Sequence, residues 1–218
     1  MQKSTKISIV IIVILILLSF AIGIYSYQKL PDKVASHWDA NGNVNGYMGK
    51  FWGIFLMPII SVFMVLLFLF LPTIDPMKNN VAKFRTYFDY FIVCIIAFFF
   101  YIYILTIVWN FGFIFDMLVM MIPALSILFF FIGILLEKSK RNWFIGIRTP
   151  WTLSSDKVWD KTHKLGAKLF KLCAIISLIG IFVPKYSIFI FIVPLLVVSV
   201  FLMVYSYIVY KKDNSSKK

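Results

Sequence analysis

Six blocks of apolar residues follow one another along the chain, and short polar segments separate them. All but one approach the ~20 consecutive apolar residues that an α-helix needs to cross ~30 Å of hydrocarbon. Because backbone polar groups in lipid must be satisfied within the segment itself, we expect each block to be helical. The six predicted spans are Ile7–Tyr25, Phe51–Leu71, Tyr87–Val108, Met117–Leu136, Leu169–Val183 and Ile188–Val209.

The fifth block is the shortest, because Lys171 and Lys185 bracket only thirteen residues. It can still span the bilayer if both lysines extend along the helix and place their ammonium groups among the lipid headgroups. We therefore expect an all-α fold, a polytopic membrane helical bundle with six transmembrane helices.

The composition supports a membrane protein and leaves little room for other classes. Hydrophobic residues make up 61% of the chain and charged residues 14%, whereas soluble domains are about half apolar and about a quarter charged. The net charge of +13 falls between and beyond the apolar blocks, so it predicts contact with membrane lipids and no direct nucleic-acid partner. Cys94 and Cys173 both lie inside apolar blocks, which predicts no disulfide, no metal site and no cofactor.

The basic residues also predict an orientation. With the N-terminus inside, eighteen lysines and arginines fall on the cytoplasmic side and four on the outer side. Cytoplasmic loops carry such an excess in most membrane proteins. We therefore expect a multi-pass protein of a bacterial cytoplasmic membrane with both termini in the cytoplasm.

The first long connection, residues 28–50, is then extracellular and rich in turn signals. Asn41-Gly42 and Asn45-Gly46 are typical of turns in which glycine adopts a positive φ. The segment Val34–Trp38 is expected to be a short strand or an extended arm. His37, Trp38 and Asp39 form a polar and aromatic triplet, which either recognises an external ligand or caps the helix ends. These groups are too few for a metal site.

The second long connection, residues 137–166, is expected in the cytoplasm. Trp143, Trp151 and Trp159 lie around Arg148, so cation–π stacking is predicted there. Ser154-Ser155-Asp156 is typical of a helix start. In the residues that follow, apolar side chains fall on one helical face and lysines mostly on the other. This pattern predicts an interfacial helix that runs into the fifth span. Anchoring to anionic lipid explains the lysines but not the uncharged polar residues of this connection.

The strings LPDKVASHWDANGNVNGY and NWFIGIRTPWTLSSDKVWDKTH resemble the bacterial SdpI family, immunity proteins against the sporulation-delaying peptide toxin. The resemblance covers most of the chain and divides it into an N-terminal segment, 1–72, and a C-terminal segment, 73–218. The outer positions of interest are Pro31, His37, Trp38, Asp39, Gly42 and Gly46. The inner positions are Asn142, Gly146, Arg148, Thr149, Pro150, Trp151, Thr152, Trp159 and His163.

The resemblance implies an integral membrane protein that protects a bacterium from a secreted, membrane-active peptide toxin. It also implies a second partner, a cytoplasmic transcriptional repressor that is held at the membrane when toxin is present. The listed positions are the binding residues of this hypothesis, and none of them is expected to be catalytic.

Two other classes of function are compatible with a membrane protein of this composition. A small transporter or exporter of an apolar peptide or solute is the main alternative, although no Lys, Arg, His or Glu lies at mid-helix for ion coupling. A membrane enzyme would have to use Ser154, Asp156, His163 and their neighbours. The chain has no nucleophile-elbow, zinc-protease or phosphate-loop motif, so we expect no enzymatic activity.

The orientation can be tested by labelling single cysteines in a chain whose Cys94 and Cys173 have been replaced. We expect Asn43→Cys to react with an impermeant maleimide added outside intact cells, and Ser154→Cys to react only after the cells are opened. The basic residues require this pattern because they disfavour translocation. Reaction of position 154 in intact cells would reverse the whole layout.

Overall fold

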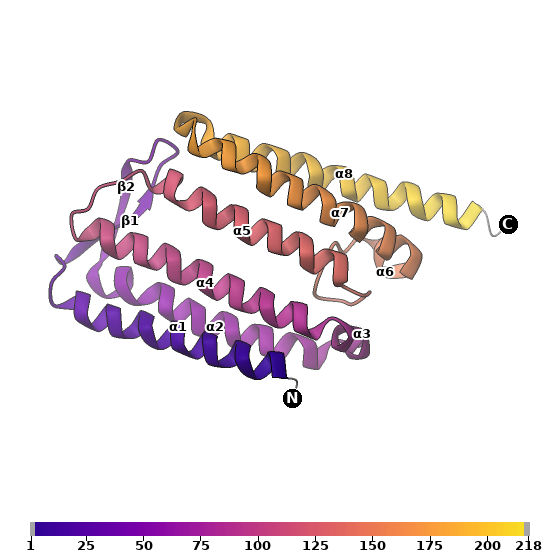
Figure 1. The fold of residues 1–218 in the computed structure, drawn as a ribbon, viewed down its shortest axis with the longest axis horizontal. Helices are drawn as coiled ribbons and strands as arrows, with labels where there is room; N and C mark the ends of the chain where they lie inside the picture. The colour runs from indigo at the N-terminus through magenta and orange to yellow at the C-terminus, as the bar shows by residue number, and fades with distance from the viewer. Residues whose placement is uncertain (1–2, 216–218) are drawn as a thin grey trace.

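The computed structural model describes residues 3–215, which form long antiparallel helices with a small β-hairpin at one end (Figure 1). The first residues of the first helix and the last residues of the last helix lie at the end of the bundle opposite the hairpin (Figure 1). We call these the hairpin end and the terminal end. The elements are α1 (Lys3–Tyr27), β1 (Lys33–Trp38), β2 (Val44–Gly49), α2 (Lys50–Ile74), α3 (Lys78–Lys83), α4 (Arg85–Asn110), α5 (Met117–Lys138), α6 (Pro150–Ser154), α7 (Asp156–Ser177), η1 (Leu178–Ile181), η2 (Pro184–Tyr186) and α8 (Ser187–Ser215).

Five helices, namely α1, α2, α4, α5 and α8, are long and apolar enough to cross a membrane. They coincide with five of the six predicted spans to within a few residues at most ends. The sixth long helix, α7, runs beside α5 and α8 but carries lysines along its first half. The predicted fifth span continued to Val183, whereas α7 ends at Ser177 and a 3₁₀ turn follows.

The outer connection contains two paired strands, one more than its pattern predicted. β1 and β2 are antiparallel, and Val34 of β1 fills a notch in α2 where a side chain at Gly53 would lie 2.1 Å from it. Asn110, at the end of α4, holds the free edge of β1: its amide accepts from Ala35 N at 2.8 Å and donates to Ala35 O at 3.0 Å. The hairpin is therefore fixed to two helices.

The helices form two groups that share a contact between α4 and α5. The first group packs α1, α2 and α4 together, and the second packs α5, α7 and α8. Hydrogen bonds also join the groups at the terminal end, where Asp75 Oδ2 accepts from Trp143 N at 3.0 Å and Asn80 Nδ2 donates to Arg141 O at 2.9 Å. The division of the sequence at residue 72 into two segments stays a prediction. The helix α4, which follows that residue, packs with α1 and α2, which begin before it.

A buried polar cluster links α1 to α4 in the first group. Asp89 is 2% exposed, and its carboxylate accepts from Thr5 Oγ1 at 2.5 Å and pairs with Arg85 Nε at 2.6 Å. A carboxylate at such a position needs partners because isolated buried charge is costly. Both partners come from the terminal end, so the cluster also fixes how α1 enters the bundle.

Small residues let α7 approach α5 closely. A Cβ at Gly133 would lie 2.9 Å from Ala167 O and 2.7 Å from Lys171 Cγ. Further along the same interface, Ser126 Oγ and Ser177 Oγ lie 2.6 Å apart and both are buried. Close backbone approach and interhelical hydroxyl bonds are the usual means of helix association in membranes.

We expect Gly133→Ala to destabilise the protein by about 1–3 kcal/mol, because the added methyl overpacks the contact with α7. The matched control is Gly49→Ala, since a Cβ at Gly49 has no neighbour within 4 Å. Unfolding in detergent with increasing dodecyl sulfate measures both. Equal stability of the two variants would show that α7 can shift away from α5 at little cost.

Candidate functional site

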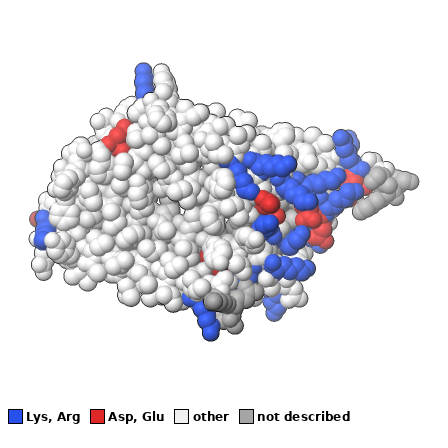
Figure 2. Space-filling view, viewed as in Figure 1, with Lys and Arg blue, Asp and Glu red and all other residues white. Residues whose placement is uncertain are grey.

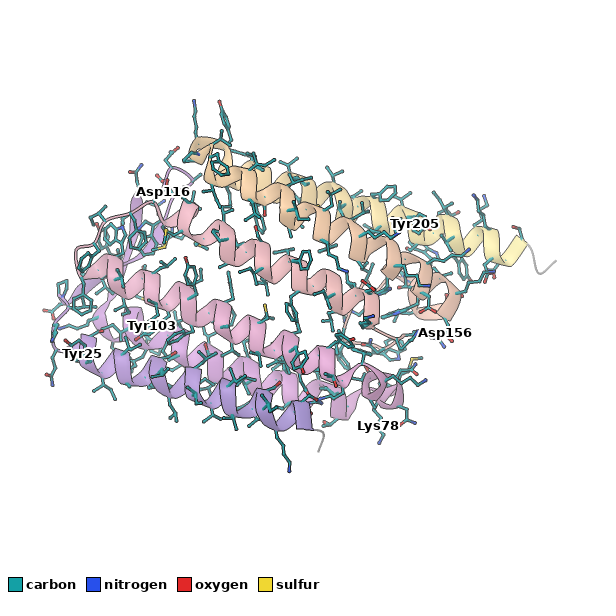
Figure 3. The ribbon with its side chains drawn as sticks, in the orientation of Figure 1. Tyr25, Lys78, Tyr103, Asp116, Asp156 and Tyr205 are labelled. Carbon is teal, nitrogen blue, oxygen red and sulfur yellow. The ribbon has the colours of Figure 1, made fainter. Side chains whose placement is uncertain are left out.

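The predicted site residues fall into two groups at opposite ends of the bundle. The outer group lies in and beside the hairpin, and the inner group lies around α6 and the start of α7 (Figure 1). Asp116, at the start of α5, marks the hairpin end, and Asp156, at the start of α7, marks the terminal end (Figure 3). The chain therefore presents two separate candidate sites, not one.

Asp39 organises the turn between the two strands. Its carboxylate accepts from Asn41 N at 2.8 Å and from Asn43 N at 3.0 Å, while its backbone N–H donates to Asn43 O. Gly42 sits in this turn with φ +78°, a conformation that side chains with a Cβ rarely adopt. A Cβ at Gly42 would also lie 3.1 Å from Asp116 Oδ1, so the turn lies close to α5.

Gly46 corrects part of the prediction for this loop. Its φ is not positive, because it lies within β2 opposite His37. Glycine is needed there for space: a Cβ would approach His37 Cβ to 2.9 Å. His37 Nδ1 lies 2.5 Å from Asn45 Oδ1, so a neighbouring amide, and not a backbone carbonyl, orients the imidazole.

Trp38 differs from its neighbours because it faces the helices. Its ring packs edge-on against Trp109 of α4, with centroids 5.6 Å apart and planes at 78°. The three residues of the predicted triplet therefore do not share one surface, because successive side chains of a strand point to opposite faces. His37 is exposed on the hairpin, Trp38 holds the hairpin to α4, and Asp39 shapes the turn.

At the terminal end, Asn142 is the centre of the connection between α5 and α6. It is fully buried, and its Oδ1 accepts from Ile145 N at 2.6 Å and Phe144 N at 3.0 Å. Its Nδ2 donates to Ile145 O at 2.9 Å and Lys140 O at 2.8 Å. One side chain thereby satisfies four backbone groups that have no helix or strand to pair with.

His163 joins this connection to α7. Its Nδ1–H donates to Trp159 O at 2.9 Å, and its Nε2 accepts from Ile147 N at 2.9 Å. The imidazole stacks on the Trp159 ring with centroids 3.9 Å apart. Gly146 passes over this stack with φ +120°, and a Cβ there would lie 2.4 Å from Nε2. The stacked rings leave no room for a side chain at residue 146, so this position requires glycine.

Thr149 and Thr152 form a reciprocal cap at the start of α6. The Thr149 hydroxyl accepts from Thr152 N at 3.2 Å, and the Thr152 hydroxyl accepts from Thr149 N at 2.9 Å. Pro150 follows at the first helical position, where a missing N–H costs nothing. The Thr149 hydroxyl also lies 2.9 Å from Ser206 Oγ, which ties this cap to α8.

The predicted stacking of Arg148 among the tryptophans is wrong. Arg148 is exposed, and its Nη1 donates to Trp143 O at 2.8 Å. Among the residues that the structure describes, no indole lies within cation–π distance of its guanidinium. Trp151 packs on Tyr207 of α8 instead, and the imidazole described above occupies the face of Trp159. His163 stacks there because its ring also hydrogen-bonds the backbones of Trp159 and Ile147.

We call the second family-like string, residues 142–163, the signature. Sequence reasoning missed the residues outside the signature that hold it in place. Ser139 O accepts from Trp159 Nε1 at 3.2 Å, and Asp75 accepts from the backbone N–H of Trp143. Asp75 is 3% exposed although it follows an apolar helix directly. A carboxylate at the end of a span, next to a proline, is the one local signal that could have drawn attention to it.

The structure also shows what contacts are made by the residues that a membrane enzyme would have to use. Ser155 caps the N-terminus of α7 by accepting from Val158 N, which confirms the predicted helix start. Asp156 pairs with Arg141 Nε at 2.9 Å, and Ser154 Oγ donates to Trp151 O. Within residues 3–215, no group of three His, Cys, Asp or Glu side chains could hold a metal ion.

Burial keeps His163 neutral in the folded protein. Removal from water lowers the pKa of its imidazole from 6.5 to about 4, and the bond from Nδ1 to Trp159 O only partly opposes this. Because Nε2 must accept from Ile147 N, protonation would also break a hydrogen bond. The inner site is thus assembled around an uncharged ring.

Comparison with known proteins finds two family matches and one similar protein. The SdpI/YfhL protein family matches residues 138–207, and a domain of unknown function, DUF1648, matches residues 14–62. Immunity protein SdpI of Bacillus subtilis (strain 168) is 29% identical over 219 residues, which covers 99% of this chain and 100% of that protein. No solved structure matches the chain significantly. The resemblance predicted from the sequence is therefore confirmed.

The neutral imidazole predicts how stability depends on pH. Since the folded pKa lies below the unfolded one, the free energy of unfolding should be constant above pH 6.5 and fall as the pH drops towards 4. The total loss should be roughly 3 kcal/mol. Unfolding of the parent and of His163→Gln at a series of pH values measures it. A decline of equal size in His163→Gln would assign the pH dependence to other groups.

Proposed function

From its similarity to the SdpI/YfhL family and to an immunity protein over its whole length, we propose that this chain protects a bacterium against a secreted, membrane-active peptide toxin. The observation that carries the proposal is where the two family matches fall. One includes the hairpin, and the other includes the entire inner site from Asn142 to His163 together with Ser206. Both candidate sites thus lie in the regions that the relatives share.

The proposed setting is the bacterial cytoplasmic membrane, crossed six times with both termini inside. On the face shown in Figure 2, lysines and arginines gather at the terminal end, and the middle of the bundle carries almost none. In this arrangement α7 begins among the lipid headgroups and its second half forms the fifth crossing. The contact of Gly133 with Ala167 supports this, because it lets the short apolar part of α7 lie deep against α5.

We propose that the outer group meets the toxin. The hairpin extends beyond the helices at its end of the bundle, and His37 and Tyr47 are exposed on it. Trp38 and Asn110 fix the hairpin to α4, so a ligand would meet a preformed surface. Preformed surfaces lose less entropy on binding.

We propose that the inner group serves a cytoplasmic partner, for which a transcriptional repressor is the candidate. Arg148 and Trp143 are exposed together on a connection whose backbone is otherwise fixed by Asn142 and His163. Arginine and tryptophan are the residues most enriched at the centres of protein interfaces. Their rigid support favours recognition over simple attachment to lipid.

An exporter of an apolar peptide or solute is the second candidate, and one observation favours it. A groove of about 580 Å³ lies between α1, α4 and α5, with almost entirely apolar walls that include Ile11, Phe98 and Ile127. An adjoining groove of about 390 Å³ lies between α5 and α7. An apolar substrate could lie there within the membrane.

The experiment that tests protection is re-expression of the chain in a sensitive strain that is challenged with secreted peptides of Gram-positive bacteria. We expect Arg148→Lys to insert normally but to reduce protection or repressor recruitment by roughly tenfold, the factor for one charge-assisted hydrogen bond. Lysine keeps the charge and cannot reproduce the guanidinium fork. Survival after challenge and membrane co-fractionation of the repressor are the two readouts.

A paired substitution tests the hairpin in the same strain. Gly46→Val should impair protection because it forces His37 aside, while Gly49→Val should not, because its site is open. The second candidate function, export, differs from protection without transport because the peptide would accumulate in the medium against its concentration gradient. If Arg148→Lys and Gly46→Val both protect like the parent at equal protein levels, and Arg148→Lys also retains repressor recruitment, neither site carries the proposed function.

A further inference from the structure

A polar hollow lies between α7 and α8 at the terminal end, apart from the inner site. Its volume is about 280 Å³, and it is bounded by one side of each helix. The first turns of α7 supply two lysines, and the last turns of α8 supply the remaining walls. We call it the α7–α8 hollow, and its lining is Lys157, Lys161, Tyr205, Ile208, Val209, Lys212 and Asp213.

The charges of the hollow do not cancel. Lys157 pairs with Asp213, whose side chain is 6% exposed, so this pair holds the two helices together. Lys161 and Lys212 remain, both are exposed, and neither has an acidic partner within ion-pair distance among residues 3–215. The hollow therefore carries two positive charges, one from each helix.

The wall of the hollow away from the terminal end is apolar. Ile208 is 44% exposed, Val209 lies beside it, and Tyr205 follows deeper along α8 (Figure 3). Seven residues separate Tyr205 from Lys212, which is about 10 Å along a helix. Positive charge at one edge, and a largely apolar wall on which Ile208 is exposed, match an amphiphile with an anionic head.

We infer that the α7–α8 hollow binds one anionic phospholipid, with its phosphodiester between Lys161 and Lys212 and an acyl chain along Ile208 and Tyr205. A free phosphate would use only the charged edge, whereas a lipid uses the apolar wall as well. Because the lysines come from two helices, the bound lipid joins the start of α7 to the end of α8. This inference is independent of toxin protection, and only the choice of leaflet rests on the proposed orientation.

The test uses the full chain in a neutral detergent, titrated with phosphatidylglycerol, phosphatidylcholine or inorganic phosphate. Native mass spectrometry counts the bound molecules. We expect one phosphatidylglycerol to bind more tightly than phosphatidylcholine, and Lys161→Gln with Lys212→Gln to weaken it by about fivefold for each lysine removed. The apolar wall predicts that inorganic phosphate does not displace the lipid.

The matched control removes the same charge from the same end of the molecule. Lys164→Gln with Lys168→Gln changes two exposed lysines of α7 that do not line the hollow, and it should leave phosphatidylglycerol binding within twofold of the parent. Equal weakening in both double variants would reduce the effect to the general basic surface and overturn the inference. Displacement of the lipid by phosphate would overturn it too, in favour of a soluble anion.

Discussion

The terminal end of the molecule depends on a single buried ring that hydrogen-bonds two stretches of backbone. His163 donates to the helix that carries it and accepts from the connection that precedes α6, so the loop is positioned by the first turns of α7. A long loop between two helices has many backbone groups without regular partners, and each must be satisfied if it is buried. Asn142 performs the same task for the first half of the connection.

This arrangement explains why glycine, histidine and tryptophan occur together in the signature. The ring can reach Ile147 N only if the intervening backbone passes directly over it, which excludes any side chain at Gly146. Trp159 supplies both the carbonyl that orients the ring and the surface on which it stacks. The positions are interdependent, so changing one alters the constraint on the others.

The sequence predicted the helices well and the contacts of the signature less well. Apolar length is read directly from the chain, and the start of α7 follows from a local cap at Ser155. The partner of Trp143 is Asp75, sixty-eight residues earlier, and no periodicity encodes such a pair. Residue types alone predict that Arg148 stacks on the tryptophans, whereas the fold turns its side chain outward. β2 was missed because Asn45 and two glycines weaken its strand pattern.

The hairpin has two unequal edges, and this sets a limit on self-association. A two-stranded sheet normally exposes both edges to other chains. Here the amide of Asn110 occupies the edge of β1 at Ala35, as a third strand would. Among residues 3–215 no side chain occupies the outer edge of β2 in this way, and a sheet with one open edge can accept one neighbour. Strand pairing between copies would therefore stop at a dimer, and the stepwise polymerisation that leads to fibrils has no second edge on which to continue.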